Sequence, residues 1–393
     1  WQTKKLGEVC EVFADGDWIE KKDQSSEGIR LIQTGNVGNG VFKERGEKAR
    51  YISEKTFKRL RCTEILPTDC LISRLPDPVG RSCIIPDTGE KMITAVDCTI
   101  IRFKKEEVLS RWFMYYSLSQ EYQNQINKQV SGATRQRISR NNLGIIEIPL
   151  TKLLEQQRII AILDEAFAAI ATAKENAGKK LQNARAIFES HLQSVFTQRG
   201  KGWVEKSLGS LASFRNGINY TKDSKGDRIK IVGVRNFKKN FSAPMDDLDT
   251  VTIDGELNEL DSLRQDYILA VRSNGNIELI GRCILVSEVT EKVSHSGFTI
   301  RIRLSNGEVL PRYLCHFIKS ASSRKRLTDG GTGTNIKSLN QGMLSTLAIL
   351  FPPISVQKIL VEKLESLSAE TKKLEAIYRQ KLADLDELKK SVL

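Results

Sequence analysis

The chain has 393 residues, of which 40% are hydrophobic and 28% are charged, as expected for a folded protein of about two to three domains and not for a disordered one. Its net charge of +13 favours a polyanionic partner. We expect no membrane span, no disulfide framework and no histidine-rich metal site or Ser-His-Asp hydrolase, because long apolar runs and Cys-x-x-Cys pairs are absent and only three histidines occur. The odd count of seven cysteines and the lack of a signal-type apolar segment favour a cytoplasmic location.

The first 152 residues show a mostly β pattern that also contains one short helix. Apolar and polar residues alternate over 29–37, 70–74 and 99–103, with clusters of Gly, Pro, Asp and Asn between them, which predicts strands joined by turns. We expect one helix over 111–127, a polar loop and then a short strand over 145–148. A long helix follows over 153–199.

The same plan returns in the second half of the chain. The pattern W-x-x-x-x-L-G at Trp1 recurs at Trp203, and the segment VGRSCII from Val79 recurs as IGRCILV from Ile280. The offset between such matches stays within 200–202 residues, so we interpret the chain as two copies of one domain, each followed by a long helix. The expected boundaries are 1–152 and 203–353 for the domains, and 153–199 and 354–393 for the helices. The second copy has its own expected helix over 311–327 and strand over 347–351.

Both long helices carry heptad patterns. Apolar residues follow each other at spacings of three and four residues, which is typical of a coiled coil. The expected core positions include Ile160, Ile170, Ala177 and His191 in the first helix, and Leu364, Thr371 and Leu385 in the second. We therefore predict an α+β protein in which two α/β domains are joined by an antiparallel coiled coil with pseudo-two-fold symmetry.

The segments that open the two helices support a family resemblance. They read IPLTKLLEQQRII from Ile148 and ILFPPISVQKILV from Ile349. Residues 1–152 and 203–353 each carry a net charge of +5, so both domains are basic. Together with the repeat and the two basic domains, these segments resemble the specificity subunit of type I restriction–modification systems, whose members read approximately P-L-P-P-L-x-E-Q-x-x-I there. The first segment matches this motif at Pro149, Glu155 and Gln156, and the second at Pro352, Pro353 and Gln357.

The resemblance implies a set of roles and partners. Each domain would be a target-recognition domain that reads one half of a bipartite site in double-stranded DNA. The helices would set the spacing and bind two methyltransferase subunits, which bind S-adenosylmethionine and methylate adenine. Restriction endonuclease subunits are a further possible partner, and the chain itself would bind no cofactor.

The sequence contains no convincing catalytic motif. An adenine methyltransferase needs an N/D-P-P-Y/F loop, whereas the only Pro-Pro pair lies between Phe351 and Ile354. Glu20 begins an E-x-K triplet that lacks the Pro-Asp of a nuclease, and the glycine-rich segment 330–333 lacks the G-K-[ST] of a P-loop. We therefore predict a protein without enzymatic activity. A coiled-coil scaffold with protein-binding ends and a stand-alone DNA-binding regulator remain as alternatives.

Polar loop residues are the candidates for DNA contact, because loops carry recognition residues while strands and helices supply the scaffold. Arginine and the amides of Gln and Asn match the donor and acceptor patterns of guanine and adenine in the major groove. For a single arginine a solvated surface charge is the competing interpretation, and the recurrence of Asn36 as Asn236 is also expected from a turn. The candidates are Gln33, Thr34, Asn36, Arg74, Thr134, Arg135, Gln136 and Arg137 in the first copy, and Arg235, Asn236, Arg272, Asn274, Thr332, Thr334, Asn335 and Lys337 in the second.

Overall fold

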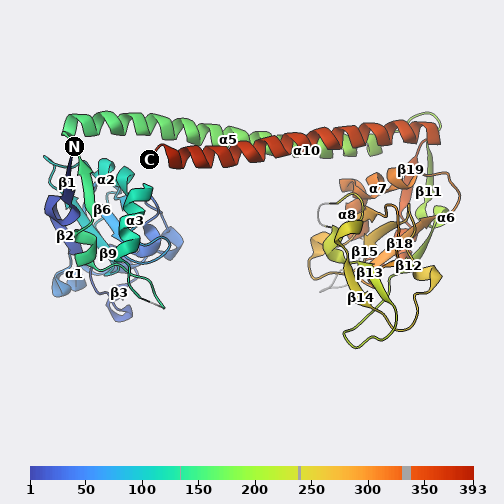
Figure 1. Cartoon of the computed structure of the whole chain (residues 1–393), viewed down its shortest axis with the longest axis horizontal. Helices are drawn as coiled ribbons and strands as arrows, with labels where there is room; N and C mark the ends of the chain where they lie inside the picture. Colours follow the sequence, from blue (N-terminus) through green and yellow to red (C-terminus); the bar gives the residue numbers. More distant parts are fainter. Residues whose placement is uncertain (133, 238–239, 330–337) are drawn as a thin grey trace. The chain divides into compact units, whose positions relative to one another are not determined.

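The computed structural model describes residues 1–132, 134–237, 240–329 and 338–393 (Figure 1). These residues form two compact units, of which the first consists of 1–177 with 381–393 and the second of 178–380. Each unit holds one copy of the repeat together with parts of both long helices, α5 (Leu153–Thr197) and α10 (Ile354–Ser391).

A four-stranded antiparallel sheet is the centre of the first copy, and its strand order is β2-β9-β6-β7. A second sheet, of order β3-β5-β4-β8, joins β4 and β8 in parallel. The strands are β2 (Cys10–Asp15), β3 (Gln24–Ser25), β4 (Ile29–Ile32), β5 (Tyr51–Ile52), β6 (Cys70–Ser73), β7 (Ser82–Ile84), β8 (Met92–Thr94) and β9 (Cys98–Phe103). A separate pair, β1 (Gln2–Lys5) and β10 (Glu147–Leu150), lies directly before α5 in the chain.

The second copy has the same topology, except that its second sheet has no strand that corresponds to β3. Its main sheet has the order β12-β18-β15-β16, and a second sheet, of order β14-β13-β17, joins β13 and β17 in parallel. The strands are β12 (Ala212–Asn216), β13 (Arg228–Val232), β14 (Asp249–Thr252), β15 (Ile268–Val271), β16 (Cys283–Leu285), β17 (Val293–His295) and β18 (Thr299–Leu304). β11 (Val204–Ser207) pairs with β19 (Ala348–Phe351) in the position of β1 and β10. The α+β fold class, with two similar domains and two long helices, is therefore confirmed.

Several of the expected elements have different bounds. The strand expected over 145–148 is β10 (Glu147–Leu150), because Ile145 still belongs to the end of the preceding short helix. The single helix expected over 111–127 is two helices, α2 (Ser110–Ser117) and α3 (Gln120–Gln129), because Ser119 caps the second one by accepting a hydrogen bond from the Tyr122 N–H at 3.2 Å. The same break separates α7 (Pro311–Lys319) from α8 (Ala321–Asp329). The strand expected over 29–37 ends at Ile32 and is followed by a 3-10 turn, Thr34–Asn36.

Two further short helices in the first copy are α1 (Glu54–Leu60) and α4 (Arg140–Gly144), and those in the second are α6 (Leu208–Leu211) and α9 (Gln341–Ser345).

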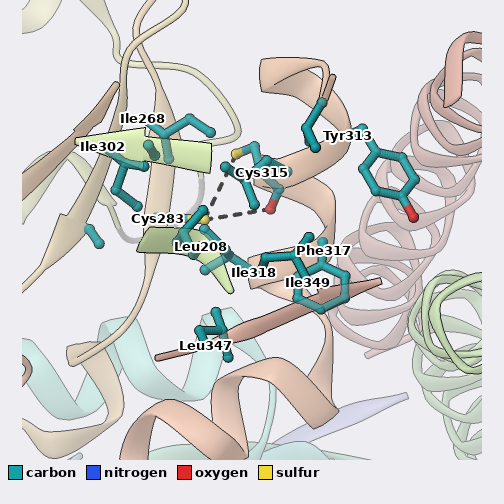
Figure 2. Packing of buried hydrophobic residues seen from close by; sticks show 14 of the residues in the cluster. Leu208, Ile268, Cys283, Ile302, Tyr313, Cys315, Phe317, Ile318, Leu347 and Ile349 are labelled. Carbon is teal, nitrogen blue, oxygen red and sulfur yellow. Dashed lines mark hydrogen bonds between the residues drawn. The ribbon is translucent and has the colours of Figure 1, made fainter. Parts of the chain in front are cut away.

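The core of the second copy packs α7 against the main sheet (Figure 2). Leu314, Cys315 and Ile318 of this helix are fully buried, and the thiols of Cys283 and Cys315 lie 3.8 Å apart. The apolar spacing in α7 thus supplies one continuous face that covers the strands.

A buried glutamine joins each long helix to its own globular part. The side chain of Gln156 accepts a hydrogen bond from the Leu109 N–H at 3.0 Å and donates to the carbonyls of Glu107 and Thr151. Gln357 makes the matching contacts with Leu310, Glu308 and Pro352. Since both glutamines are fully buried, these bonds fix how the helix leaves each domain.

Parts of the two long helices run antiparallel to each other within each unit. In the first unit Lys174 pairs with Asp386, and the Lys389 ammonium lies 5.7 Å from the centre of the Phe167 ring. In the second unit the Arg185 guanidinium lies 3.2 Å from the Glu375 carboxylate.

The expected heptad positions in α5 are buried or half-buried, with the exception of His191. Ile160, Ile170, Ala177 and Ala184 have less than a tenth of their surface exposed. His191 was placed on this face wrongly, because the structure exposes His191 and buries Leu192. No helix in the described part of the chain is long and apolar enough to cross a membrane.

Candidate DNA interface

One end of the main sheet in the first copy gathers several of the candidate residues. β2 ends at Asp15, β6 ends at Ser73 and β9 begins at Cys98, so the loops that follow or precede them meet at the same edge. Arg74 is the first residue after β6, and its carbonyl accepts a hydrogen bond from the Ile138 N–H at 3.2 Å. This bond connects the edge of the sheet to the loop that contains residues 134–137.

The loop 131–137 projects two arginines over a single carboxylate. Two backbone hydrogen bonds between Ser131 and Arg137, of 3.0 and 2.9 Å, close the loop, and Gly132 adopts a φ of +105° that favours glycine. The guanidinium groups of Arg135 and Arg137 lie 3.7 and 3.3 Å from the two oxygens of Asp97. The side chains of the two arginines remain 72% and 44% exposed. Asp97 thus holds both arginines together and leaves donor groups facing solvent. Thr134 and Gln136 are also exposed in this loop.

Arg74 lies beneath this loop and not on its surface. Its side chain is 5% exposed, donates to the Val96 carbonyl at 2.5 Å and lies 3.4 Å from the Asp15 carboxylate. Burial lowers the pKa of the Arg74 guanidinium, and the nearby Asp15 carboxylate opposes that effect. These contacts favour a role for Arg74 in positioning the loops.

Asn36 and Asn236 have the same structural role in the two copies. The Asn36 side chain accepts a hydrogen bond from the Gln33 N–H at 3.0 Å and donates to the Lys43 carbonyl. The Asn236 side chain accepts from the Gly233 N–H at 2.9 Å and donates to the carbonyl of Asp247. Both amides are buried, so their recurrence is explained by the turn that they close. Neighbouring Gln33 and Thr34 are half-buried.

The second copy presents a different set of side chains at the matching edge. A pocket of 590 Å³ lies there, and the residues that line it include Tyr220, Arg235, Asn274 and Phe298. Arg235 forms ion pairs with Asp249 at 2.8 Å and with Asp247 at 3.5 Å. The Asn274 side chain accepts a hydrogen bond from the Asn276 N–H. Arg272 is half-buried, and its backbone N–H donates to the Phe298 carbonyl at 2.8 Å. Thr332, Thr334, Asn335 and Lys337 lie outside the described residues.

Four aromatic or acidic residues at these edges, Trp18, Asp97, Tyr220 and Phe298, were not among the candidates. Trp18 is 70% exposed beside the turn that ends β2, and Phe298 is 59% exposed beside the turn that opens β18. Asp97 and Phe298 occupy matching positions, because each accepts the backbone hydrogen bond of the arginine that follows the central strand. An alignment of the two repeats, with an offset of 201, pairs Asp97 with Phe298 and could have identified this difference.

The described residues contain no group of three or more His, Cys, Asp or Glu that could hold a metal ion. The geometry at the two sheet edges consists instead of exposed donors, amides and aromatic rings. Such groups recognise a surface by hydrogen bonding and stacking.

Comparison with known proteins identifies the family. Residues 1–181 and 200–382 each match the model of the type I restriction modification DNA specificity domain. The chain therefore belongs to this family, and the resemblance to the specificity subunit of type I restriction–modification systems is confirmed.

Two curated relatives match along nearly the whole chain. The StySPI specificity subunit of Salmonella potsdam is 23% identical, and the match covers 100% of this chain and 87% of the relative. The EcoKI specificity subunit of Escherichia coli K12 is 24% identical, and the match covers 95% of this chain and 83% of the relative.

Solved structures show the same fold. A chain from a study of complex assembly and conformational transition of the type I R-M system has a TM-score of 0.79 at 14% identity, with 100% of this chain and 96% of that chain covered. The HsdS subunit from Thermoanaerobacter tengcongensis has a TM-score of 0.62 at 14% identity, with 100% of this chain and 95% of that chain covered.

Proposed function

We propose that this chain is the non-catalytic subunit that recognises a bipartite DNA target and directs partner methyltransferase subunits to it. The observation that carries the proposal is the contrast between the two copies. Their scaffold contacts recur residue by residue, as at Gln156 and Gln357, whereas the exposed groups at the sheet edges differ. A repeated scaffold with two different recognition edges is suited to a target with two different half-sites.

The exposed side chains at the sheet edge of the first copy are of the types that recognise bases. Arg135 and Arg137 present guanidinium groups that can donate two hydrogen bonds to the O6 and N7 atoms of guanine. Their pairing with Asp97 restricts the arginine side chains before DNA binds, which lowers the conformational entropy lost on binding. Gln136 lies between the two arginines and offers an amide suited to adenine.

The second edge would read its half-site with other groups. Asn274 offers an amide, and Phe298 and Tyr220 offer rings that can contact a thymine methyl group or stack on an unpaired base. The net charge of +13 supports attraction to the DNA backbone in addition to base contacts.

The long helices would set the distance between the two recognition edges and bind the methyltransferase subunits. Leu154 and Ile162 of α5 and Ile377 of α10 are exposed apolar side chains that a methyltransferase subunit would cover on binding. We expect S-adenosylmethionine on the methyltransferase subunits and no cofactor on this chain. Restriction endonuclease subunits remain a further possible partner. A protein-binding scaffold would not need two basic copies, and a homodimeric repressor would not need two different ones.

Methylation mapping tests the proposal. The chain is expressed with its methyltransferase subunits, and modified adenines are located by long-read sequencing of the cellular DNA. The expected result is one bipartite motif with a fixed gap, which disappears when this chain is omitted. Adenine methylation by the purified chain alone would contradict the non-catalytic role, and an unchanged motif without this chain would contradict the recognition role.

A further inference from the structure

A positively charged pocket lies within the second unit, between α7 and nearby parts of both long helices. Its volume is 360 Å³, which is at the small end of the range of ligand sites. Polar groups of α7, α8 and α10 line it together with apolar side chains of α5, such as Phe188 and Leu192. None of these residues belongs to the recognition edge described above.

His316 is a buried polar side chain in the wall of this pocket. It is 2% exposed, and within the described part of the chain neither of its ring nitrogens has a hydrogen-bond partner. Its ring packs against Phe241, with the ring centres 4.4 Å apart. Burial, with smaller contributions from Lys319 and Arg312, lowers the pKa of His316 to about 3, so the ring is neutral and keeps one N–H donor. Buried polar groups are normally paired, so a group that enters the pocket would supply the hydrogen-bond partner that this ring lacks among the described residues.

Cationic side chains surround the same space. Lys319 donates to the Asn240 carbonyl at 3.1 Å, and Arg324 donates to the Glu278 carbonyl at 2.8 Å while its buried Nε has no partner among the described residues. Arg282 and Lys372 also line the pocket.

The single lining carboxylate does not neutralise these cations, because Glu375 already pairs with Arg185 and Arg379. The pocket therefore favours an anion.

The first copy does not carry this arrangement. His316, Lys319 and Arg324 match Tyr115, Leu118 and Gln123 at the offset of 201. The Tyr115 hydroxyl donates to Asp164, and the Gln123 amide donates to the Val79 carbonyl at 3.2 Å. Since the fold forms there without the cationic group, the fold itself does not require that group in the second copy.

We propose that this pocket binds a small organic phosphate of the size of a nucleoside monophosphate. Lys319, Arg324 and Lys372 would hold the phosphate group, and the His316 N–H would donate to one of its oxygens. The flat apolar portion of the ligand would lie against Phe188 and Leu192. The site is separate from DNA recognition and gives this chain a ligand of its own.

Isothermal titration of the intact chain with adenosine 5′-monophosphate tests the proposal in the absence of DNA and partner subunits. We expect saturable binding of the nucleotide, no binding of adenosine, and competition by inorganic phosphate at constant ionic strength. Lys372→Ala should weaken binding by about tenfold, because one charge-assisted contact is lost, whereas Lys373→Ala on the same helix should leave it unchanged. His316→Phe, which retains a flat ring, should also weaken binding without loss of helix content by circular dichroism.

Three results would overturn the proposal. The first is the absence of saturable nucleotide binding, and the second is an equal loss in Lys372→Ala and Lys373→Ala, which would indicate general charge attraction. The third is displacement of the nucleotide by duplex DNA, because the pocket would then belong to the DNA interface. None of these measurements depends on methylation, so they are separate from a failure of the proposed function.

Discussion

The two globular copies use the same contacts where they join the long helices and different contacts at the opposite edges of their sheets. At the helix side, Gln156 and Gln357 make equivalent hydrogen bonds, and the Lys4–Glu107 ion pair is matched by Lys206–Glu308. At the other edge, Asp97 binds two arginines in the first copy, whereas exposed Phe298 occupies its position in the second. The comparison indicates that the scaffold and the recognition groups can change independently of each other.

A change in the length of α5 is the strongest test of whether the scaffold and the recognition groups are independent. Two residues inserted after Ala177 turn α5 by about 200°, which moves its apolar face away from α10 and should abolish methylation by the complex. Four residues turn it by about 40° beyond a full turn and add about 6 Å, so activity should persist. Methylation mapping should then show the same two half-sites with a gap longer by about one or two base pairs. An active four-residue variant with the original gap would exclude the helices as the spacer.

Removal of the arginines at the first edge should affect one half-site only. Arg135→Ala with Arg137→Ala removes two base contacts worth roughly 1–3 kcal/mol each. We expect relaxed or lost recognition of one half-site, measured by binding to duplexes with substitutions in either half. Phe298→Ala is the matched variant and should affect only the other half-site. An equal loss at both halves would assign the arginines to general attraction or to folding.

Substitution of the buried glutamines tests the contacts with the long helices that the two copies share. Gln156→Leu leaves the Leu109 N–H and the carbonyls of Glu107 and Thr151 without their partner, at a cost of about 3 kcal/mol in the free energy of unfolding. Gln357→Leu should have a similar effect, because its three bonds are equivalent. Urea unfolding followed by circular dichroism measures both. Gln157→Leu, at an exposed neighbouring position, is the control and should change stability little.

Acid should weaken the second unit more than the first. Burial lowers the pKa of both His295 and His316 to about 3, whereas the third histidine, His191, is exposed. Below the unfolded pKa of about 6.5 the unfolded chain binds more protons, so stability falls as pH decreases from about 6.5 toward 3. At pH 5 the loss is about 2 kcal/mol for each histidine. Hydrogen exchange at pH 7 and pH 5 compares the units, and His316→Phe should reduce the loss. Equal acid sensitivity of both units would contradict this account.

The sequence alone predicted the parts of the structure that depend on repetition and periodicity. The repeat offset placed matching strands and turns, and the heptad spacing identified positions such as Ile170 and Ala184, which are buried. Near the end of α5 one predicted position was wrong, since His191 is exposed and Leu192 is buried where the second domain packs against the helix, whereas the next predicted position, Val195, is buried. At this end of α5, packing against the second domain determines which side chains are buried.

The candidate recognition residues were less predictable for a similar reason. Arg74 and Arg137 look alike in the sequence, yet one is buried beside Asp15 and the other is exposed beside Asp97. Asn36 and Asn236 recur because they close turns. The exposure of a side chain depends on the segments that cover it, and those segments are distant in sequence.

The strand pairs β1–β10 and β11–β19 also have a consequence for chain topology. Gln2 lies opposite Leu150, and Val204 lies opposite Phe351, so each globular part begins and ends at neighbouring points. Opposite residues in an antiparallel pair are only about 4.5–5.5 Å apart, a distance that about two residues span. The chain therefore enters and leaves each globular part at the same place, next to the base of a helix. Insertions, deletions or complete replacement of the residues between the two paired strands leave the path of the helices unchanged, provided that the two strands still pair.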